Sequence, residues 1–301
     1  ARGIEVPMPF DPDDIPPAAI GVPIIMCALT EYRTVLRRTA VLSTTAGQLF
    51  SWSRVRVAGR EAVVAGCGVG KVNAAMATQA VLDRFRPPAI VVAGSAGSLC
   101  AEVRPGDVVI GERVVQHDAG INLGRRYAHL GVDVWGARGR SYQRTLDAPA
   151  DLVALARAAA EELPAVHAGE ARVHAGCIAT GDQVIFSSQR KAAIWEAWGA
   201  LAVEMESGAV AQVAQTNGVP WLLIRGISDG ADENEGIDLS RLVSYAEDGA
   251  TLRGWMRRQA RRAGYLARHP DAPARMRRLV QGIQAAAGRA AEVAALVVGR
   301  L

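Results

Sequence analysis

Residues 202–232 read AVEMESGAVAQVAQTNGVPWLLIRGISDGAD, and this stretch indicates the fold class. It predicts a helix that begins near Glu206 and runs to about Thr216, followed by an Asn-Gly turn. The apolar run from Trp221 to Arg225 then predicts a buried strand. A helix, a turn and a buried strand form one αβ unit. We therefore expect an α/β fold with a mixed, mostly parallel central sheet flanked by helices.

Two acidic residues lie at the ends of this unit. Glu206 stands at the start of the predicted helix, and Asp229 follows Ser228 just beyond the strand. Ligands of open α/β sheets bind beyond the carboxyl ends of the strands, so both acids could face one pocket. The alternative is structural, with Glu206 as a helix N-terminal carboxylate and Asp229 as an N-cap. The pattern alone leaves both interpretations open.

The length and composition fit one large α/β domain with an appendage. The chain has 301 residues, of which 50% are hydrophobic, enough for a sizeable core. We expect an extended proline-rich arm at 1–21, an α/β domain at 22–238 and a helical extension at 239–301. No apolar run is long enough for a transmembrane helix, and the first residues lack the apolar core of a signal peptide. The four cysteines stand singly and the histidines show no ligand spacing, so we expect a cytoplasmic protein without a metal.

Basic residues are concentrated at the C-terminal end. Residues 251–301 hold eleven arginines and two acids, a net charge of +9, so the rest of the chain has 23 basic and 28 acidic residues, or −5. A repeat of apolar residues from Met276 to Val297 predicts a long amphipathic helix with arginines mostly outside the apolar stripe. The arginine-bearing face of this helix is either solvated or contacts an acidic partner or a membrane surface. Nucleic acid is not expected, since few aromatic residues alternate with the arginines.

The two halves of the opening stretch resemble a known signature. VEMESGAVAQVA followed by LLIRGISDGAD is similar to the motif of the nucleoside phosphorylase superfamily. The closest branch is that of the methylthioadenosine/S-adenosylhomocysteine nucleosidases, and the similarity extends more weakly from about Val22 to Asp232. The resemblance implies a nucleoside phosphorylase-like domain. It also implies that Asp229 donates a proton to the purine, that Glu206 binds the ribose hydroxyls, and that Met205 and Ser228 support them.

One motif departs from this family. The nucleosidases end their first strand in a sequence like GAMEEE, whose last glutamate activates the attacking water. Here the stretch from Cys27 reads CALTEY, which puts Tyr32 at that position and Glu31 one before it. Either Glu31 takes the role through a small shift, or the water is handled differently. A structural role for Glu31 in the first turn of a helix is the alternative.

Further segments contribute candidates for the substrate site. The glycine-rich GCGVGKV at 66–72 lacks the residues of a phosphate-binding P-loop and is similar instead to the family's SGIGKV. The loop after the strand near residue 94 resembles GSAGGL, the HDA at 117–119 resembles a family HDA motif, and residues 181–186 resemble SGDAFI. In the last of these, Val184 replaces the phenylalanine that stacks on adenine. The resulting candidates for substrate contact are Val69, Ser95, Gly97, His117, Val184 and Ile185.

These features lead to one expected function and three alternatives. We expect hydrolysis of the N-glycosidic bond of a purine nucleoside or 5′-substituted adenosine, by a homo-oligomer that needs no cofactor. One alternative is phosphorolysis with phosphate as co-substrate, although the residues Val92-Ala93-Gly94 lack the arginine of true phosphorylases. A second is adenine release from a lipid-linked adenosine such as adenosylhopane, suggested by the basic tail. The third is a nucleoside sensor that has lost catalysis.

Overall fold

The computed structural model describes residues 21–47, 50–124, 127–136, 139–231, 238 and 252–301. The strands are β1 (Ile24–Ala28), β2 (Ala40–Ala46), β3 (Phe50–Val57), β4 (Arg60–Cys67), β5 (Ile90–Ser98), β6 (Val108–Gln116), β7 (Gly120–Asn122), β8 (Tyr127–His129), β9 (Val132–Gly136), β10 (Gly139–Gln143), β11 (Leu146–Asp147), β12 (Val173–Thr180), β13 (Ala200–Glu204) and β14 (Trp221–Asp229). The helices are α1 (Leu29–Leu36), α2 (Lys71–Phe85), α3 (Ala150–Glu161), α4 (Pro164–His167), α5 (Ser188–Trp198), α6 (Ser207–Thr216), α8 (Leu252–Arg268) and α9 (Ala272–Val298).

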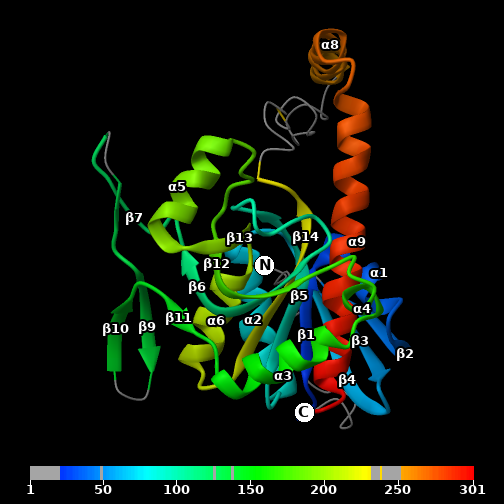
Figure 1. Cartoon of the computed structure of the whole chain (residues 1–301), viewed down its shortest axis with the longest axis vertical. Coiled ribbons are helices and arrows are strands. Elements are labelled where there is room, and N and C mark those ends of the chain that lie inside the picture. Colours follow the sequence, from blue (N-terminus) through cyan, green and yellow to red (C-terminus); the bar gives the residue numbers. More distant parts are fainter. Residues whose placement is uncertain (1–20, 48–49, 125–126, 137–138, 232–237, 239–251) are drawn as a thin grey trace, which may run out of the picture.

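One ten-stranded sheet forms the centre of the molecule (Figure 1). Its order is β11-β6-β12-β13-β5-β1-β4-β3-β2, and β14 pairs with both β5 and β6. Among the described strands of this sheet, five neighbouring pairs are parallel and five are antiparallel. The α/β class is therefore as expected and the sheet is mixed, whereas its predicted mostly parallel character is not confirmed.

Helices cover both faces of the sheet. The apolar residues of α2 and α6 share one core with the sheet, and those of α1, α3 and α9 share a second. The inner strands are buried along most of their length, β1 over all five residues, because both of their faces are covered. The long helix predicted from the apolar repeat at Met276 to Val297 is present as α9.

The C-terminal half of α9 belongs to the second core. Its buried side chains are small, and this lets the helix lie directly against β14. At the closest approach, a Cβ on Gly226 would collide with the backbone carbonyl of Ala286, so only glycine fits. Figure 1 shows α9 running along the sheet and extending beyond it, with α8 at its far end. The division expected at residue 238 stays a prediction.

Two segments differ from what the sequence indicates. The strand β5 continues through Ser95 and Gly97 to Ser98, where a turn was expected, because it pairs with β14 and β13 over this stretch. Residues 122–147 show no clear sequence period and nevertheless contain the short strands β8 to β11. Of the expected helical extension at 239–301 the structure describes residues 252–301, and residues 1–20 of the expected arm lie outside the described residues. No helix in the described part of the chain has the length and apolar character to cross a membrane.

Candidate active site

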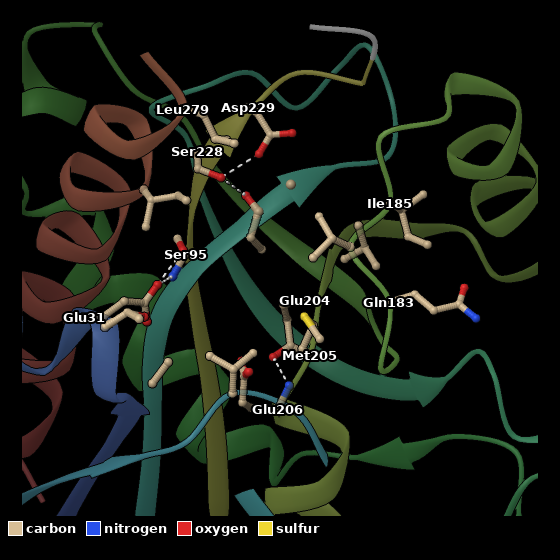
Figure 2. Close-up of a pocket in the computed structure, with 18 of the residues that line it drawn as sticks. Glu31, Ser95, Gln183, Ile185, Glu204, Met205, Glu206, Ser228, Asp229 and Leu279 are labelled. Carbon is tan, nitrogen blue, oxygen red and sulfur yellow. Dashed lines mark hydrogen bonds between the residues drawn. The ribbon is translucent and has the colours of Figure 1, made fainter. Parts of the chain in front are cut away.

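A cavity of about 250 Å³ lies where β5, β13 and β14 end. It contains the acids of both halves of the opening stretch and Glu31, as Figure 2 shows. The first strand, the β5 segment, the loop before α5 and helix α9 supply the other walls. The residues that line it are Ala28, Thr30, Glu31, Val69, Ser95, Ala96, Gly97, Gln183, Val184, Ile185, Phe186, Val203, Glu204, Met205, Glu206, Ser228, Asp229, Leu279 and Ile283.

An arginine buried beneath the cavity organises its acidic side chains. Arg225 is 1% exposed, and its Nη2 donates to Glu204 Oε2 and, at 2.8 Å, to Ser207 Oγ. Glu204 Oε2 also accepts the backbone N–H groups of Glu206 and Ser207, at 2.9 and 2.8 Å. One carboxylate therefore compensates the buried cation and holds the first turn of α6 in place. This network fixes the backbone position of Glu206.

Glu206 is held at the cavity wall with an altered acidity. Its Oε1 accepts the backbone N–H of Gly70 at 3.0 Å, and its Oε2 lies 3.9 Å from Arg225 Nη2. Burial, followed by repulsion from Glu204, raises the pKa of Glu206 to about 7, although Arg225 opposes the rise. The neutral and ionised forms of this carboxyl group are therefore both accessible near neutral pH.

Glu31 reaches the same cavity from the first turn of α1. Its Oε1 accepts the Ser95 backbone N–H at 2.8 Å and the Ser95 hydroxyl. Its Oε2 is buried and has no hydrogen-bond partner among the described residues. A Cβ on Gly94 would collide with both this oxygen and Arg225 Nη1, so the two groups border one small space. Burial raises the pKa of Glu31, against the opposing charge of Arg225, which favours a base of moderate strength.

Tyr32 is directed away from the cavity. It is buried on the other side of α1, where its ring lies against Gly66 and its hydroxyl is 2.6 Å from Ser53 Oγ. The ungapped alignment with the family motif therefore assigns the cavity position to the wrong residue. In the structure Glu31 lines the cavity and Tyr32 is a core residue, because consecutive residues of a helix point about 100° apart.

Asp229 stands at the end of β14 with a partner at each oxygen. Ser228 Oγ donates to Oδ1 at 2.7 Å, and Lys191 Nζ lies 3.2 Å from Oδ2. Lys191 also donates to the Gly230 carbonyl at 2.8 Å. A Cβ on Gly97 would come within 3.2 Å of Oδ2, so the backbone of β5 approaches the carboxyl group closely. The cation beside Asp229 is therefore Lys191, and Arg225 faces Glu204 instead.

Apolar side chains form the remaining walls. Met205 lies between Glu204 at the end of β13 and Glu206 at the start of α6, and Val69 faces the cavity from the glycine-rich turn. From the loop before α5, the cavity receives Val184, which is 57% exposed, as well as Ile185 and Phe186. The aromatic ring expected at position 184 is absent, and Phe186 lies two residues further along the same wall.

The structure does not bring His117 to this cavity. The side chain lies behind Gly181 and lines a separate cavity with His129, Arg144 and Arg190. Both ring nitrogens are buried without a hydrogen-bond partner among the described residues, and burial lowers the pKa of the ring. Its predicted contact with substrate is not supported by this placement in the single chain.

Comparison with known proteins places the chain in a family. A family model described as the phosphorylase superfamily matches residues 24–263. The chain belongs to this superfamily. The resemblance of the VEMES and SDGAD motifs is thereby confirmed.

Curated relatives within the superfamily are nucleosidases. The 5′-methylthioadenosine/S-adenosylhomocysteine nucleosidase of Geobacillus kaustophilus (strain HTA426) is 38% identical over 196 residues, which cover 65% of this chain and 78% of the relative. The enzyme of the same name from Mycobacterium tuberculosis (strain CDC 1551 / Oshkosh) is 35% identical over 195 residues, which cover 60% and 74%. These relatives confirm that the closest branch is the one expected from the motifs.

Solved structures of the superfamily share the fold. The nucleosidase of Neisseria meningitidis in complex with methylthio-immucillin-A aligns with a TM-score of 0.66 at 23% identity, covering 94% of this chain and all of that one. The futalosine hydrolase of Helicobacter pylori strain 26695 aligns with a TM-score of 0.66 at 22% identity, covering 94% and 99%. At this identity the similarity concerns the fold, and it extends over 94% of this chain.

Four residues that line or border the cavity were not predicted from the sequence as site residues. Glu204 was noted as part of the motif, but its ion pair with Arg225 depends on how β13 and β14 each pair with β5, which no local pattern gives. Leu279 and Ile283 come from α9, far along the chain. Lys191 carried one usable signal, because it shares the buried face of α5 with Ile194. The described residues include no group of His, Cys, Asp or Glu arranged to hold a metal.

Proposed function

We propose that this protein hydrolyses the N-glycosidic bond of a 5′-substituted adenosine and releases adenine. The observation that carries the proposal is the convergence of Glu31, Glu206 and Asp229 on one cavity, with the Oε2 of Glu31 buried and unpartnered within the described residues. The nucleosidases among the curated relatives support the reaction class. The enzyme is thus an N-glycosidase of the phosphorylase superfamily.

The proposed role of Asp229 is to protonate the leaving group. Adenine departs as an anion unless N7 is protonated, so a carboxylic acid at the purine end of the cavity lowers the barrier. Asp229 has the position for this role at the end of β14, and Ser228 orients its Oδ1 at 2.7 Å. In donating, the Oδ–H bond breaks, the N7–H bond forms and Asp229 is left as a carboxylate.

Glu206 and Met205 address the sugar. As the glycosidic bond breaks, positive charge develops on the ribose ring, and a fixed carboxylate beside it stabilises that charge. The N–H of Gly70 and the network of Glu204 hold Glu206 for hydrogen bonds from the ribose hydroxyls. Met205 supplies an apolar surface against the ring.

The proposed role of Glu31 is to activate the nucleophilic water. Its free Oε2 can accept a proton from a water molecule held in the space that it borders with Arg225. Ser95 fixes the other oxygen with two donors, so the orientation of the carboxylate is set before substrate binds. This arrangement favours Glu31 as the base and makes the departure at Tyr32 compatible with catalysis.

The charge of the cavity favours water over phosphate as the acceptor. A phosphate dianion needs cationic or N–H partners. Four acids line the described cavity, and the arginine beneath it is already paired with Glu204 and Ser207. Phosphorolysis, including that of a lipid-linked adenosine, therefore requires donors that the described walls do not supply. A sensor without catalysis would have no use for the oriented pair of Glu31 and Asp229.

The deciding experiment is base release from a panel of nucleosides. Adenosine, 5′-methylthioadenosine, S-adenosylhomocysteine, inosine and a lipid-linked adenosine are each incubated with and without phosphate, and products are separated by chromatography. We expect adenine and free 5-substituted ribose from the 5′-thio substrates without phosphate. Strict dependence on phosphate would refute hydrolysis, and tight binding without any turnover would support the sensor.

We further propose that the protein is a cytoplasmic homo-oligomer. Large apolar side chains are exposed on the β7–β10 segment: Ile121, Leu130, Trp135 and Tyr142. Exposed apolar side chains concentrated in one segment are typical of a protein interface. Light scattering after size exclusion would give the mass of a dimer or larger assembly, whereas a monomer at micromolar concentration would contradict the proposal.

Contact with a membrane surface through the basic C-terminal helices is a separate proposal. Exposed arginines on α8 and the first turns of α9 support it: Arg257, Arg262, Arg277 and Arg278. Anionic lipids attract such residues. Cosedimentation with phosphatidylserine vesicles at low salt, lost when these arginines are replaced by glutamine, is the expected result. Equal recovery with neutral vesicles would contradict it.

A further inference from the structure

The buried lysine beside Asp229 has no part in the chemistry described so far. Lys191 lies in the second turn of α5 and is 1% exposed. The serine at the start of this helix, Ser187, caps it by accepting the Arg190 N–H at 3.2 Å. The burial of an ammonium group is costly unless it is paired, so its position against Asp229 requires a compensating gain.

Among the residues that the structure describes, Lys191 is the charged group that contacts Asp229. Within the described residues, the charged side chains lining the cavities on either side of Asp229 are Glu31, Glu204 and Glu206 on one side and Arg104 and Lys191 on the other. Helix α9 presents the apolar Leu279 here. The Nζ of Lys191 lies 3.2 Å from Oδ2 and 2.8 Å from the Gly230 carbonyl, so its direction is fixed by two acceptors.

An ammonium group in this place acts on the charge that forms when Asp229 donates. During donation the carboxyl group becomes an anion, and the nearby cation stabilises that developing charge. This stabilisation grows as the proton is transferred. The Lys191–Asp229 contact therefore favours donation of the proton to the departing base.

We propose that Lys191 is a positioning residue that strengthens Asp229 as the proton donor by stabilising the carboxylate formed when the purine leaves. This inference rests on the proposed hydrolysis of adenosines. The proton passes from the Asp229 carboxyl group to N7, and Lys191 keeps all three of its own protons throughout. Ser228 retains the opposite oxygen, so the donor stays oriented while its charge changes.

The loop that lines the cavity is tied to the same interaction. Residues 183–186 precede α5 directly, and Lys191 connects this helix to the end of β14. The contact therefore holds the wall formed by Ile185 and Phe186 at a fixed distance from Asp229. Loss of the lysine would affect both acid strength and the position of this wall, and the experiment separates the two.

The test compares two leaving groups in Lys191→Met and Lys191→Gln. Adenine in 5′-methylthioadenosine needs a proton to leave, whereas the 4-nitrophenolate of 4-nitrophenyl 5-methylthioriboside does not. We expect kcat/KM for the first to fall about 100-fold relative to the second, the lower end of the range for a general acid. The ratio within one sample is independent of how much of the variant has folded.

A further readout completes the experiment. In an Asp229→Asn background, the lysine substitution should leave the ratio of the two substrates unchanged. Equal losses for both substrates in the single variant would assign Lys191 a structural role and overturn the inference. If the unaltered enzyme hydrolyses neither substrate, the proposed function fails instead.

Discussion

Replacement of Glu206 by glutamine should stabilise the protein at alkaline pH while abolishing its activity. Burial and the neighbouring Glu204 raise the pKa of Glu206 from an ordinary 4.5 to about 7. A rise of about 2.5 pH units, at 1.36 kcal/mol per unit, corresponds to about 3 kcal/mol. The folded state therefore binds a proton that the unfolded state has already lost between these two pH values.

The sign of the effect follows from linkage. Between pH 4.5 and 7 the unfolded chain holds fewer protons at this site, so the free energy of unfolding falls as the pH rises. Above pH 7 the full cost of about 3 kcal/mol is present in the unaltered protein. Glutamine removes that cost, and its amide oxygen can still accept the Gly70 N–H. The stability gain should be small at pH 5 and largest at pH 8, where it is worth roughly 5–10 °C in Tm.

The assay is thermal unfolding of both proteins at pH 5, 6, 7 and 8, with Glu196→Gln on the exposed surface of α5 as the matched control. When the Tm values of two proteins are subtracted at one pH, the contribution of every group that titrates equally in both cancels. A stability difference that is the same at pH 5 and pH 8 would refute the reasoning. Because Glu206 must be ionised to accept the ribose hydroxyls, kcat/KM of the unaltered enzyme should also fall as pH drops below about 7.

Three other substitutions test the site and the fold. Asp229→Asn keeps the hydrogen-bonding shape but cannot donate a proton, so adenine release should fall 10²- to 10⁴-fold while calorimetry still detects ligand binding; undiminished turnover would exclude Asp229 as the acid. Glu31→Gln should reduce turnover by about 10²-fold or more with little change in KM, whereas Tyr32→Phe should retain most activity. A larger loss of turnover in Tyr32→Phe than in Glu31→Gln would assign the catalytic role to Tyr32. Gly226→Ala should destabilise the fold by about 1–3 kcal/mol or more in urea unfolding, since its Cβ would meet the Ala286 carbonyl. The control, Gly264→Ala on α8, should be neutral or stabilising, because the added Cβ meets little there. Equal effects of the two substitutions would contradict the packing of α9.

The sequence indicates most of the elements because their signals are local. The periodic pattern predicts α9 with nearly correct bounds, and the apolar run predicts the start of β14 at Trp221. This strand continues to Asp229, where the apolar run predicted an end at Arg225. Local patterns do not indicate how these elements pair. The antiparallel contacts of β14 with β6 and of β13 with β5 depend on the whole topology, so the sheet is less parallel than its αβ units indicate.

Some residues of the candidate site are likewise indicated by local motifs, and others depend on how distant elements pack. The motif residues Glu206 and Asp229 reach one cavity, as their positions after neighbouring segments indicate. The orientation of Glu31 against Tyr32 depends on where α1 begins, and a one-residue difference exchanges the cavity side for the core side. The contact of Lys191 with Asp229 joins two segments 38 residues apart in the chain, through a side chain that composition would assign to the surface.

The packing of α9 on the sheet has a consequence for synthesis on the ribosome. This helix ends 69 residues after β14, from Asp229 to Val298. The face of the sheet that α9 covers therefore stays exposed until these residues have been synthesised. At about 5–20 residues per second, their synthesis takes roughly 3–14 s. During that interval the apolar side chains of β1, β5 and β14 on that face are open to other nascent chains. The cell's chaperones, rather than the final stability of the enzyme, would then govern the yield of active protein.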